Sequence, residues 1–329
     1  MGLKFLDLFA GIGGFRLGME KAGHKCIGYV EFDKFARKSY EAMYDTKGEW
    51  TTHDITTVTN DDIRELRNRG RVDVITGGFP CQTFSIAGKR KGFEDTRGTL
   101  FFEIARFANI LQPRYLFLEN VKGLLNHDNG NTFETILRTL DELGYDAEWD
   151  LLNSKDFGVP QNRERVFIIG HLRGERTRKV FPVERSYSKI IETSSIKFAD
   201  YRYDEGLRIR KNGTVPCLKA NNHKMGTDGM DLSNGVYAVL TPDRIEKRQN
   251  GRRLKDDGEP SFTLTAQDRH GVYDGFQIRK LTPKECWRLQ GFPDELFEKA
   301  AKVNSNSQLY KQAGNSVTVN VIYEIAKKL

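Results

Sequence analysis

Long apolar segments are missing from this 329-residue sequence: no run of eighteen or more apolar residues occurs, so no predicted helix is long enough to span a bilayer. The first residues also lack the basic leader and apolar stretch of a secretion signal, and Met1–Leu8 instead has the apolar pattern of a strand. The sequence therefore predicts a cytoplasmic protein with no membrane attachment.

Cysteine is scarce, with four residues that stand far apart and form no CxxC pair: Cys26, Cys81, Cys217 and Cys286. This spacing disfavours both a zinc site and a disulfide framework. We therefore expect a reduced protein without a metal ion. A lone cysteine in an unusual loop is then a candidate nucleophile, although most such residues are inert apolar side chains.

The formal net charge is +7, and its location along the chain is informative. Residues 171–280 contain 22 Lys and Arg against 15 Asp and Glu, whereas the two signs balance in the rest of the chain. A solvated basic face would explain such a segment. Concentration of the whole excess in one third of the chain favours a polyanionic partner such as nucleic acid.

The first 170 residues alternate short apolar runs with amphipathic segments, which predicts a parallel sheet covered by helices, as in doubly wound α/β folds. The predicted strands are Lys4–Phe9, Cys26–Glu31, Val72–Thr76, Tyr115–Glu119 and Val166–Gly170. The predicted helices are Phe35–Met43, Asp61–Arg69, Leu100–Leu111 and Thr132–Leu143, the last with a stop signal at Gly144.

From about residue 181 the helical periodicity fades, and Gly, Asn, Asp and Arg separate short strand-like segments such as Tyr237–Leu240 and Ser261–Thr265. This pattern is typical of an irregular β-rich domain. We therefore predict two domains: residues 1–180 with 294–329, and residues 181–293.

A glycine-rich loop, Asp7–Gly14, follows the first predicted strand and precedes a helix. Glycines let the backbone approach a ligand closely, and doubly wound folds bind cofactors at strand ends. Glu31 ends the next strand and could accept hydrogen bonds from a ribose diol. The loop is compatible with NAD, FAD or S-adenosylmethionine, and also with a tight structural turn, because its glycine spacing departs from GxGxxG.

A second loop, Gly77–Ser85, places a proline and Cys81 at the carboxyl end of an apolar strand. A thiol on a rigid bend above the cofactor edge suits a covalent mechanism and has no use in a dehydrogenase. The next residues, 86–98, are rich in Gly, Lys and Arg, as a mobile lid that contacts phosphates would be.

Two further motifs carry charged side chains. In Phe117–Val121, Glu119 could protonate a ring nitrogen if it is held in a dry pocket, or could cap a helix. In Gln161–Arg165, Arg163 and Arg165 face the same side of an extended chain. Both could point at one acceptor-rich ligand, or they could form a surface ion-pair ladder.

Together and in this order, these motifs resemble those of the bacterial C5-cytosine DNA methyltransferase family. The family's Phe-x-Gly-x-Gly, Pro-Cys, Glu-Asn-Val and Gln-x-Arg-x-Arg motifs match, as do two more near the C-terminus. The resemblance covers nearly all of the chain outside 181–278. The matching segments are Phe9–Gly13, Pro80–Cys81, Glu119–Val121, Gln161–Arg165, Arg279–Pro283 with Arg288–Pro293, and Gly314–Val317.

The resemblance implies a Rossmann-like, S-adenosylmethionine-dependent methyltransferase domain of α/β class and a smaller, irregular β-rich target-recognition domain. It implies that Glu31 holds the ribose of the cofactor and that Phe32 stacks on the adenine. The full set of implied cofactor residues is Asp7, Phe9, Gly11, Gly13, Gly14, Glu31, Phe32, Asp54, Ile55, Pro80, Asn315 and Val317.

The implied reaction is methyl transfer from S-adenosylmethionine to C5 of a cytosine in double-stranded DNA. Cys81 would add to C6, and protonated Glu119 would hydrogen-bond N3. Arg165, with Arg163 beside it, would hold O2 and lower the pKa of Cys81. The cytosine must first leave the duplex, at a cost of about a few kcal/mol that phosphate contacts can offset.

DNA contacts are expected in the lid and in the second domain. Phosphate contacts bind without reading sequence, whereas polar side chains at base edges read it. Ordinary turn chemistry would also explain the polar loop that follows Ser261–Thr265. The expected residues are Ser85 and Arg97 in the lid, Arg252 and Arg253 at phosphates, and Gln267, Asp268, Arg269 and His270 at bases.

Three other functions stay open at the level of sequence: an RNA methyltransferase of the same fold, a non-catalytic nucleic-acid-binding protein and a nicotinamide oxidoreductase. The basic second domain favours DNA by analogy only. Intact Cys81, Glu119 and Arg165 argue against a non-catalytic protein, and an oxidoreductase leaves Pro80–Cys81 without a role. We expect a monomer, and the sequence does not specify the recognition site or whether a restriction enzyme accompanies it.

Overall fold

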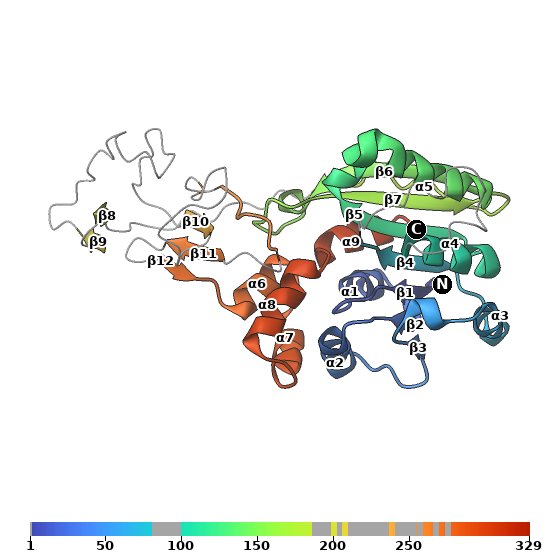
Figure 1. Cartoon of the computed structure of the whole chain (residues 1–329), viewed down its shortest axis with the longest axis horizontal. Helices are drawn as coiled ribbons and strands as arrows, with labels where there is room; N and C mark the ends of the chain where they lie inside the picture. Colours follow the sequence, from blue (N-terminus) through green and yellow to red (C-terminus); the bar gives the residue numbers. More distant parts are fainter. Residues whose placement is uncertain are drawn as a thin grey trace.

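A seven-stranded sheet forms the core of the α/β part of the protein, on the right in Figure 1. The computed structural model describes residues 2–80, 100–185, 199–202, 206–209, 237–240, 255, 259–265, 270–273 and 278–329. The strands of the sheet are β1 (Lys4–Leu8), β2 (Lys25–Val30), β3 (Trp50–Thr52), β4 (Val74–Gly78), β5 (Tyr115–Val121), β6 (Tyr145–Asn153) and β7 (Glu164–Leu172). Their spatial order is β3-β2-β1-β4-β5-β7-β6.

The strand order changes direction between β1 and β4. From β1 the chain moves outward through β2 and β3, and it then returns to place β4 on the other side of β1. β1 pairs in parallel with both β2 and β4. Open α/β sheets bind ligands outside the carboxyl ends of the strands at such a switch point. The loops that follow Leu8 and Gly78 meet there.

β7 runs antiparallel to both β5 and β6, so the predicted parallel arrangement is wrong at this edge of the sheet. Only residues 154–163 connect β6 to β7, including the short 3-10 helix η5 (Ser154–Asp156). A connection of this length cannot make the crossover that a parallel pair needs. The reversal brings the start of β7 to the end of β5, where Arg165 pairs with Val121.

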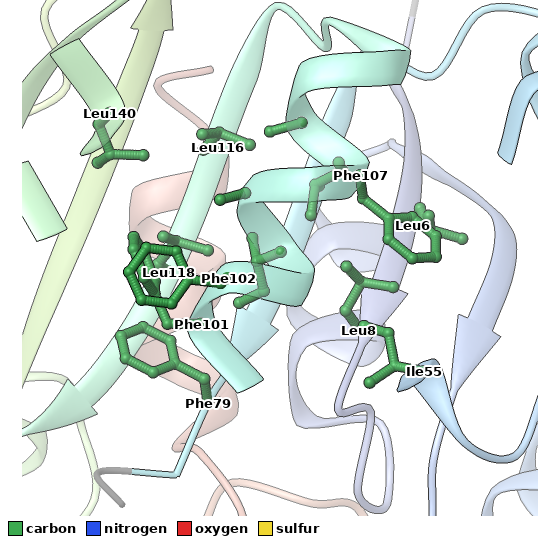
Figure 2. Close-up of a cluster of buried hydrophobic side chains, with 14 of the residues drawn as sticks. Leu6, Leu8, Ile55, Phe79, Phe101, Phe102, Phe107, Leu116, Leu118 and Leu140 are labelled. Carbon is green, nitrogen blue, oxygen red and sulfur yellow. The ribbon is translucent and has the colours of Figure 1, made fainter. Parts of the chain in front are cut away.

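Helices cover both faces of the sheet, as a doubly wound fold requires. Alternate residues of β5 point to opposite faces, so Leu116 and Leu118 join one apolar cluster, and Tyr115 and Phe117 join the other. Figure 2 shows the first cluster. The first cluster includes α3 (Asn60–Arg69), α4 (Leu100–Leu111) and α5 (Asn131–Glu142), and the second includes α1 (Gly14–Lys21) and α9 (Val319–Ala326).

A third apolar cluster surrounds the fully buried Trp287 and joins the C-terminal helices to the first half of the chain. Its Ala36 and Met43 come from α2, on which α7 and α8 pack. Its helices are α2 (Lys34–Met43), α6 (Pro283–Leu289), α7 (Asp294–Ala301) and α8 (Asn306–Asn315). Residues close to the C-terminus thereby lie beside the loop that leaves β2.

The sequence-based elements agree with the structure to within a few residues at most boundaries. α4 spans the predicted residues, and Gly144 ends the region of α5 with a φ of 88°. β3 and β6 were not predicted. Ser261–Thr265, predicted as a strand, is extended chain joined to the rest by a single bridge between Ser261 and Gln161.

Two small antiparallel sheets lie apart from the central sheet (Figure 1). One pairs β8 (Ala199–Arg202) with β9 (Gly206–Ile209), and the other contains β10 (Tyr237–Leu240), β11 (His270–Tyr273) and β12 (Ile278–Lys280). The strand expected at Tyr237–Leu240 is confirmed. Within the described parts of the chain, no helix is long and apolar enough to cross a membrane.

Candidate active site

The ends of β4 and β5 bring two of the predicted catalytic motifs together. Their parallel register places Gly78 opposite Glu119. A Cβ on Gly78 would lie 3.2 Å from Glu119 Oε2, so the lack of a side chain lets the carboxylate lie against the end of β4. Cys81 follows three residues after Gly78 and, with Ser85 and Arg97, lies outside the described residues.

Asn120 fixes the bend that leads from β4 toward Cys81. Its Nδ2 donates a 2.8 Å hydrogen bond to the carbonyl of Phe79, and its Oδ1 accepts one from the backbone N–H of Val121. Asn120 and Phe79 are 2% and 3% exposed. Sequence reasoning missed this role of Asn120, although a buried amide beside Glu119 on an otherwise apolar strand was a signal for it.

Glu119 and Arg165 form a buried ion pair. Arg165 Nε lies 3.0 Å from Glu119 Oε1, and the side chains are 16% and 10% exposed. Burial raises the pKa of Glu119 above its ordinary value, and the positive charges of Arg165 and Arg163 oppose that rise without cancelling it. Glu119 therefore keeps its proton to a higher pH than an exposed glutamate, as a general acid should.

Arg163 points at backbone carbonyls. Its side chain donates from Nη1 to Leu264 (2.8 Å) and from Nη2 to Gly314 (3.1 Å) and Ser316 (2.7 Å). Burial, with the charge of Arg165, lowers the pKa of Arg163 to about 9. Among the described residues the two arginines therefore have different partners, and their joint contact with a ligand stays a prediction.

The glycine-rich loop after β1 has an unusual backbone. Phe9, Gly11 and Gly13 have φ values of 57°, 57° and 78°. This left-handed region is unfavourable for a bulky residue such as Phe9, and strain of this kind concentrates at ligand sites. Apart from Gly11 itself and its two chain neighbours, no described residue has a heavy atom within 4 Å of the position that a Cβ on Gly11 would take. Space is therefore open beside the backbone of Gly11.

Glu31 ties this loop to the end of β2. Its Oε2 accepts a 2.7 Å hydrogen bond from the N–H of Gly11, and its Oε1 accepts another of 2.7 Å from the N–H of Asp33. Burial raises the pKa of Glu31. The next residue, Phe32, is 75% exposed. A fixed carboxylate beside an exposed ring offers a hydrogen-bond acceptor and a stacking surface side by side.

Asp54 and Ile55 follow β3, the strand next to β2. Asp54 Oδ1 accepts hydrogen bonds from the backbone N–H (2.9 Å) and hydroxyl (2.7 Å) of Thr56, at the start of the 3-10 helix η1 (Ile55–Thr57). Ile55 packs into the first apolar cluster. Their contact with a cofactor stays a prediction.

Asp7 is the fourth residue of β1 and lies inside the sheet. It is 0% exposed, and the hydroxyl of Thr76 donates to its Oδ1 over 2.9 Å. Its Oδ2 has no hydrogen-bond partner among the described residues. Burial raises the pKa of Asp7 to about 8. The predicted contact of Asp7 with a cofactor stays a prediction.

The C-terminal segment packs on both loops of the switch point. A Cβ on Gly14 would lie 2.7 Å from Val317 Cγ2 and 2.9 Å from Ser316 Oγ, and a Cβ on Gly78 would lie 3.9 Å from Val317 Cγ1. Asn315, the last residue of α8, is exposed. The segment that was predicted to close the cofactor site therefore does lie against the loops that were predicted to form it.

A family model for the C-5 cytosine-specific DNA methylases matches residues 3–329, which is nearly the whole chain. The chain belongs to this family. The protein is therefore a DNA (cytosine-5)-methyltransferase, as the order of its motifs predicted. A nicotinamide oxidoreductase, one of the alternatives, is excluded.

Individual DNA methylases resemble the chain over almost their full lengths. It is 40% identical to the type II methyltransferase M.HpaII of Haemophilus parainfluenzae (99% of this chain, 88% of the relative) and 37% identical to M.HhaI of Haemophilus parahaemolyticus (99% and 93%). It is 35% identical to the orphan methyltransferase M.SPRI of Bacillus phage SPR (99% and 97%).

Solved structures share the fold. A prophage-encoded protein of Escherichia coli superposes with a TM-score of 0.65 at 22% identity, and the S. pombe Dnmt2 methyltransferase with 0.59 at 19%. In both cases the match covers 99% of this chain and 98% of the other. This DNA methylase therefore shares its overall fold with these two proteins.

Most of the predicted DNA-binding residues of this methylase lie outside the described residues, namely Arg252, Arg253, Gln267, Asp268 and Arg269. His270 begins β11 and is 8% exposed, which suits packing better than contact with a base edge. Within the described residues, no group of three or more His, Cys, Asp and Glu side chains could hold a metal ion.

Proposed function

We propose that the enzyme takes its methyl group from S-adenosylmethionine and methylates a cytosine within a specific site of double-stranded DNA. Cys81 would be the nucleophile, Glu119 the acid at N3 and Arg165 the partner of O2. The observation that carries this proposal is the buried Glu119–Arg165 pair at the end of β5, directly beside the end of β4 from which the chain continues to Cys81.

The residues at the switch point fit this cofactor. The open space at Gly11 leaves room for a ligand against the backbone, and the carboxylate of Glu31 can accept hydrogen bonds from ribose hydroxyls. The exposed ring of Phe32 can stack on adenine. Bound there, the cofactor would supply an electrophilic methyl group. Val317 would cover the methionine part from the C-terminal side.

The side chains of the enzyme would make C5 of cytosine reactive by covalent addition. The Cys81 thiolate would form a bond to C6, which breaks the aromatic ring and makes C5 nucleophilic. Glu119 would hold its proton at N3, and Arg165 would donate to O2, so that both stabilise the charge that addition places on the ring. After methyl transfer, a base removes the C5 proton and the Cys81–C6 bond breaks, which restores the ring and the thiolate.

Residues 181–293 would form the target-recognition domain, with β8–β12 as parts of it. Cytosine atoms inside a duplex are out of reach, so the base must swing out at a cost of about a few kcal/mol, which phosphate contacts of this basic region can offset.

Cellular or phage DNA is met in the cytoplasm, and one catalytic centre suffices for one cytosine. We therefore propose a cytoplasmic monomer.

The decisive test is capture of DNA that carries 5-fluorocytosine at the methylated position, after bisulfite sequencing of DNA from expressing cells has mapped that position. Fluorine cannot leave C5 as a proton does, so the thioether between Cys81 and C6 should accumulate when S-adenosylmethionine is present. Mass spectrometry of the digested adduct should place the DNA on Cys81.

Cys81→Ala should abolish the adduct. Cys286→Ala is the matched control and should leave it unchanged, because Cys286 is buried in α6 and burial raises its pKa to about 12. RNA of the same sequence should not compete with the DNA. An adduct of normal yield in Cys81→Ala would contradict the proposed nucleophile.

A further inference from the structure

Arg163 is a buried cation whose partners are all neutral. It is 3% exposed, and among the described residues it forms no ion pair with a carboxylate, whereas Arg165, two residues on, pairs with Glu119. Three backbone carbonyls occupy its two terminal nitrogens. A buried charge is costly unless hydrogen bonds compensate it, so this arrangement depends on all three carbonyls being in place.

Two of these carbonyls belong to Gly314 and Ser316, at the C-terminal end of α8. A positive charge is favourable there because the carbonyls at a helix C-terminus carry partial negative charge. The residue after Ser316 is Val317, which packs on Gly14 and Gly78 in the two loops of the switch point. Arg163 therefore holds the segment that presents Val317 to the proposed cofactor site.

The same helix also holds the adenosine side of the site. Lys311 Nζ lies 2.7 Å from Oδ2 of Asp33, and Gln312 Nε2 donates to the carbonyl of Phe35 over 3.0 Å. Asp33 in turn donates its N–H to Glu31 and caps the N-terminus of α2. α8 thus connects the guanidinium of Arg163 to the turn that carries Glu31 and Phe32.

The third carbonyl, that of Leu264, belongs to the part of the chain that we propose binds DNA. Segment 259–265 lies within the proposed target-recognition domain. Its backbone is also held by Gln161 Oε1, which accepts from the N–H of Leu264 (3.0 Å), and by Asn162, whose N–H donates to the carbonyl of Ser261 (2.8 Å). Arg163 therefore joins a segment of the DNA side to α8 through one side chain.

We propose that Arg163 is a positioning residue that couples cofactor binding to DNA binding, by holding α8 and segment 259–265 in one arrangement. The inference rests on the proposed function, because it takes the loops at the switch point as the cofactor site and 181–293 as the DNA side. Coupling is reciprocal: DNA tightens cofactor binding by the same factor by which cofactor tightens DNA binding. Arg165, with its bond to Glu119, acts on the chemical step.

The test compares Arg163→Met and Arg163→Lys with Arg165→Met as the matched control. Calorimetry measures the Kd of S-adenosylhomocysteine, which cannot react, with and without a DNA duplex that contains the mapped site, and the ratio of the two constants is the coupling factor. Steady-state rates measure kcat and the KM for S-adenosylmethionine. Wild-type enzyme should show coupling within the roughly 5- to 150-fold range that is typical.

In Arg163→Met the coupling factor should fall toward one and the KM for the cofactor should rise by about 10-fold, while kcat changes by less than about 3-fold. Arg163→Lys should recover part of the coupling, since an ammonium group can still donate to these carbonyls. Arg165→Met should do the reverse, with a lower kcat and normal coupling.

If kcat falls in Arg163→Met while the coupling factor stays normal, the inference is overturned in favour of a catalytic role. If a lower melting temperature is the only change, it is overturned in favour of a merely structural role. If Arg163→Met does not fold, Lys311→Met perturbs α8 from its half-exposed side, and an unchanged cofactor KM there would also overturn it. Failure of the proposed function itself would be separate, as an absence of the Cys81 adduct in wild-type enzyme.

Discussion

Burial and charge act in opposite directions on Glu119, and burial is the larger effect. The carboxyl group lies at the end of a core strand with no side chain on Gly78 to separate it from β4, and its main compensation is Arg165 at 3.0 Å. Desolvation therefore raises the pKa of Glu119 although two arginines lie nearby. The same position that makes the charged form costly favours the protonated form, which the proposed hydrogen bond to N3 of cytosine requires.

The pH profile of kcat/KM should report this balance. If protonated Glu119 is the active form, activity falls as pH rises through its pKa. Arg165→Met removes a charge that lowers this pKa, so the alkaline limb should move to higher pH, while the rate at the optimum falls by about 10- to 100-fold for the lost charged hydrogen bond.

Arg165→Lys is the control, because it keeps the positive charge beside Glu119. The alkaline limb of its pH profile should stay near the wild-type position, although its rate should be lower. Profiles of kcat/KM between weakly acidic and alkaline pH would decide this. A limb that moves to lower pH in Arg165→Met would contradict the assignment to Glu119.

Single residues could be predicted from the sequence where a motif marks them and not where backbone atoms are the partners. Glu119 and Arg165 could be singled out because each lies in a short pattern at a strand end, and the structure pairs their side chains. The acceptors of Arg163 are carbonyls that lie 101, 151 and 153 residues away along the chain, and every residue has such a carbonyl. No side-chain pattern could have pointed to them.

At the scale of elements, periodicity identified most strands and helices of the sheet but not the direction of β7. Its apolar pattern is the same whether it runs parallel or antiparallel, and only its pairing with β5 and the short connection from β6 decide between them. β6 itself was missed because its side chains are mostly half-buried or exposed at the edge of the sheet, so its apolar signal is weak.

The contact between α1 and α9 provides a test of packing. A Cβ on Gly18 would lie 2.6 Å from Cβ and Cγ2 of Ile322 and 3.0 Å from the backbone N of Tyr323. Alanine gains about 1 kcal/mol of helix propensity over glycine, but overpacking costs about 1–3 kcal/mol. Because backbone atoms of α9 cannot move aside cheaply, Gly18→Ala should lower the free energy of unfolding.

Gly123→Ala is the control, since its nearest neighbour would be Val121 Cγ2 at 4.0 Å, and its stability should be close to that of the wild type. Urea denaturation of both variants would measure the difference. Equal or higher stability of Gly18→Ala would show that the two helices are less tightly packed than the structure indicates.

At the scale of the whole molecule, the net charge is divided along the chain in the same way as the two proposed functions, catalysis and DNA binding. All of the net charge of +7 lies within residues 171–280, and the rest of the chain is neutral overall. In the proposed function, the neutral α/β body carries out the chemistry and the basic third attracts the polyanion. Attraction to phosphates does not depend on DNA sequence and weakens as salt rises. Contacts with base edges, in contrast, determine which sequence is bound.

Variants of the basic region should separate these two kinds of contact. Arg252→Ala should weaken binding to every DNA duplex and reduce the slope of log K against log salt by about 1. Gln267→Ala or Arg269→Ala should instead relax the preference at one base position by about 1–3 kcal/mol. Binding titrations at several salt concentrations and methylation mapping measure the two effects. An unchanged site in both loop variants would place the base-reading residues elsewhere in 181–278.

The packing of α9 on α1 also bears on the order in which the protein is made. The two helices are about 300 residues apart in the chain, so at roughly 5–20 residues per second the ribosome completes α9 about 15–60 s after α1. During that interval the face of α1 that carries Gly14 and Gly18 lacks the cover that Val317 and Ile322 later provide. The emerging α/β body is therefore expected to depend on chaperones until its last helix arrives, and loss of α9 should cost soluble yield before it costs activity.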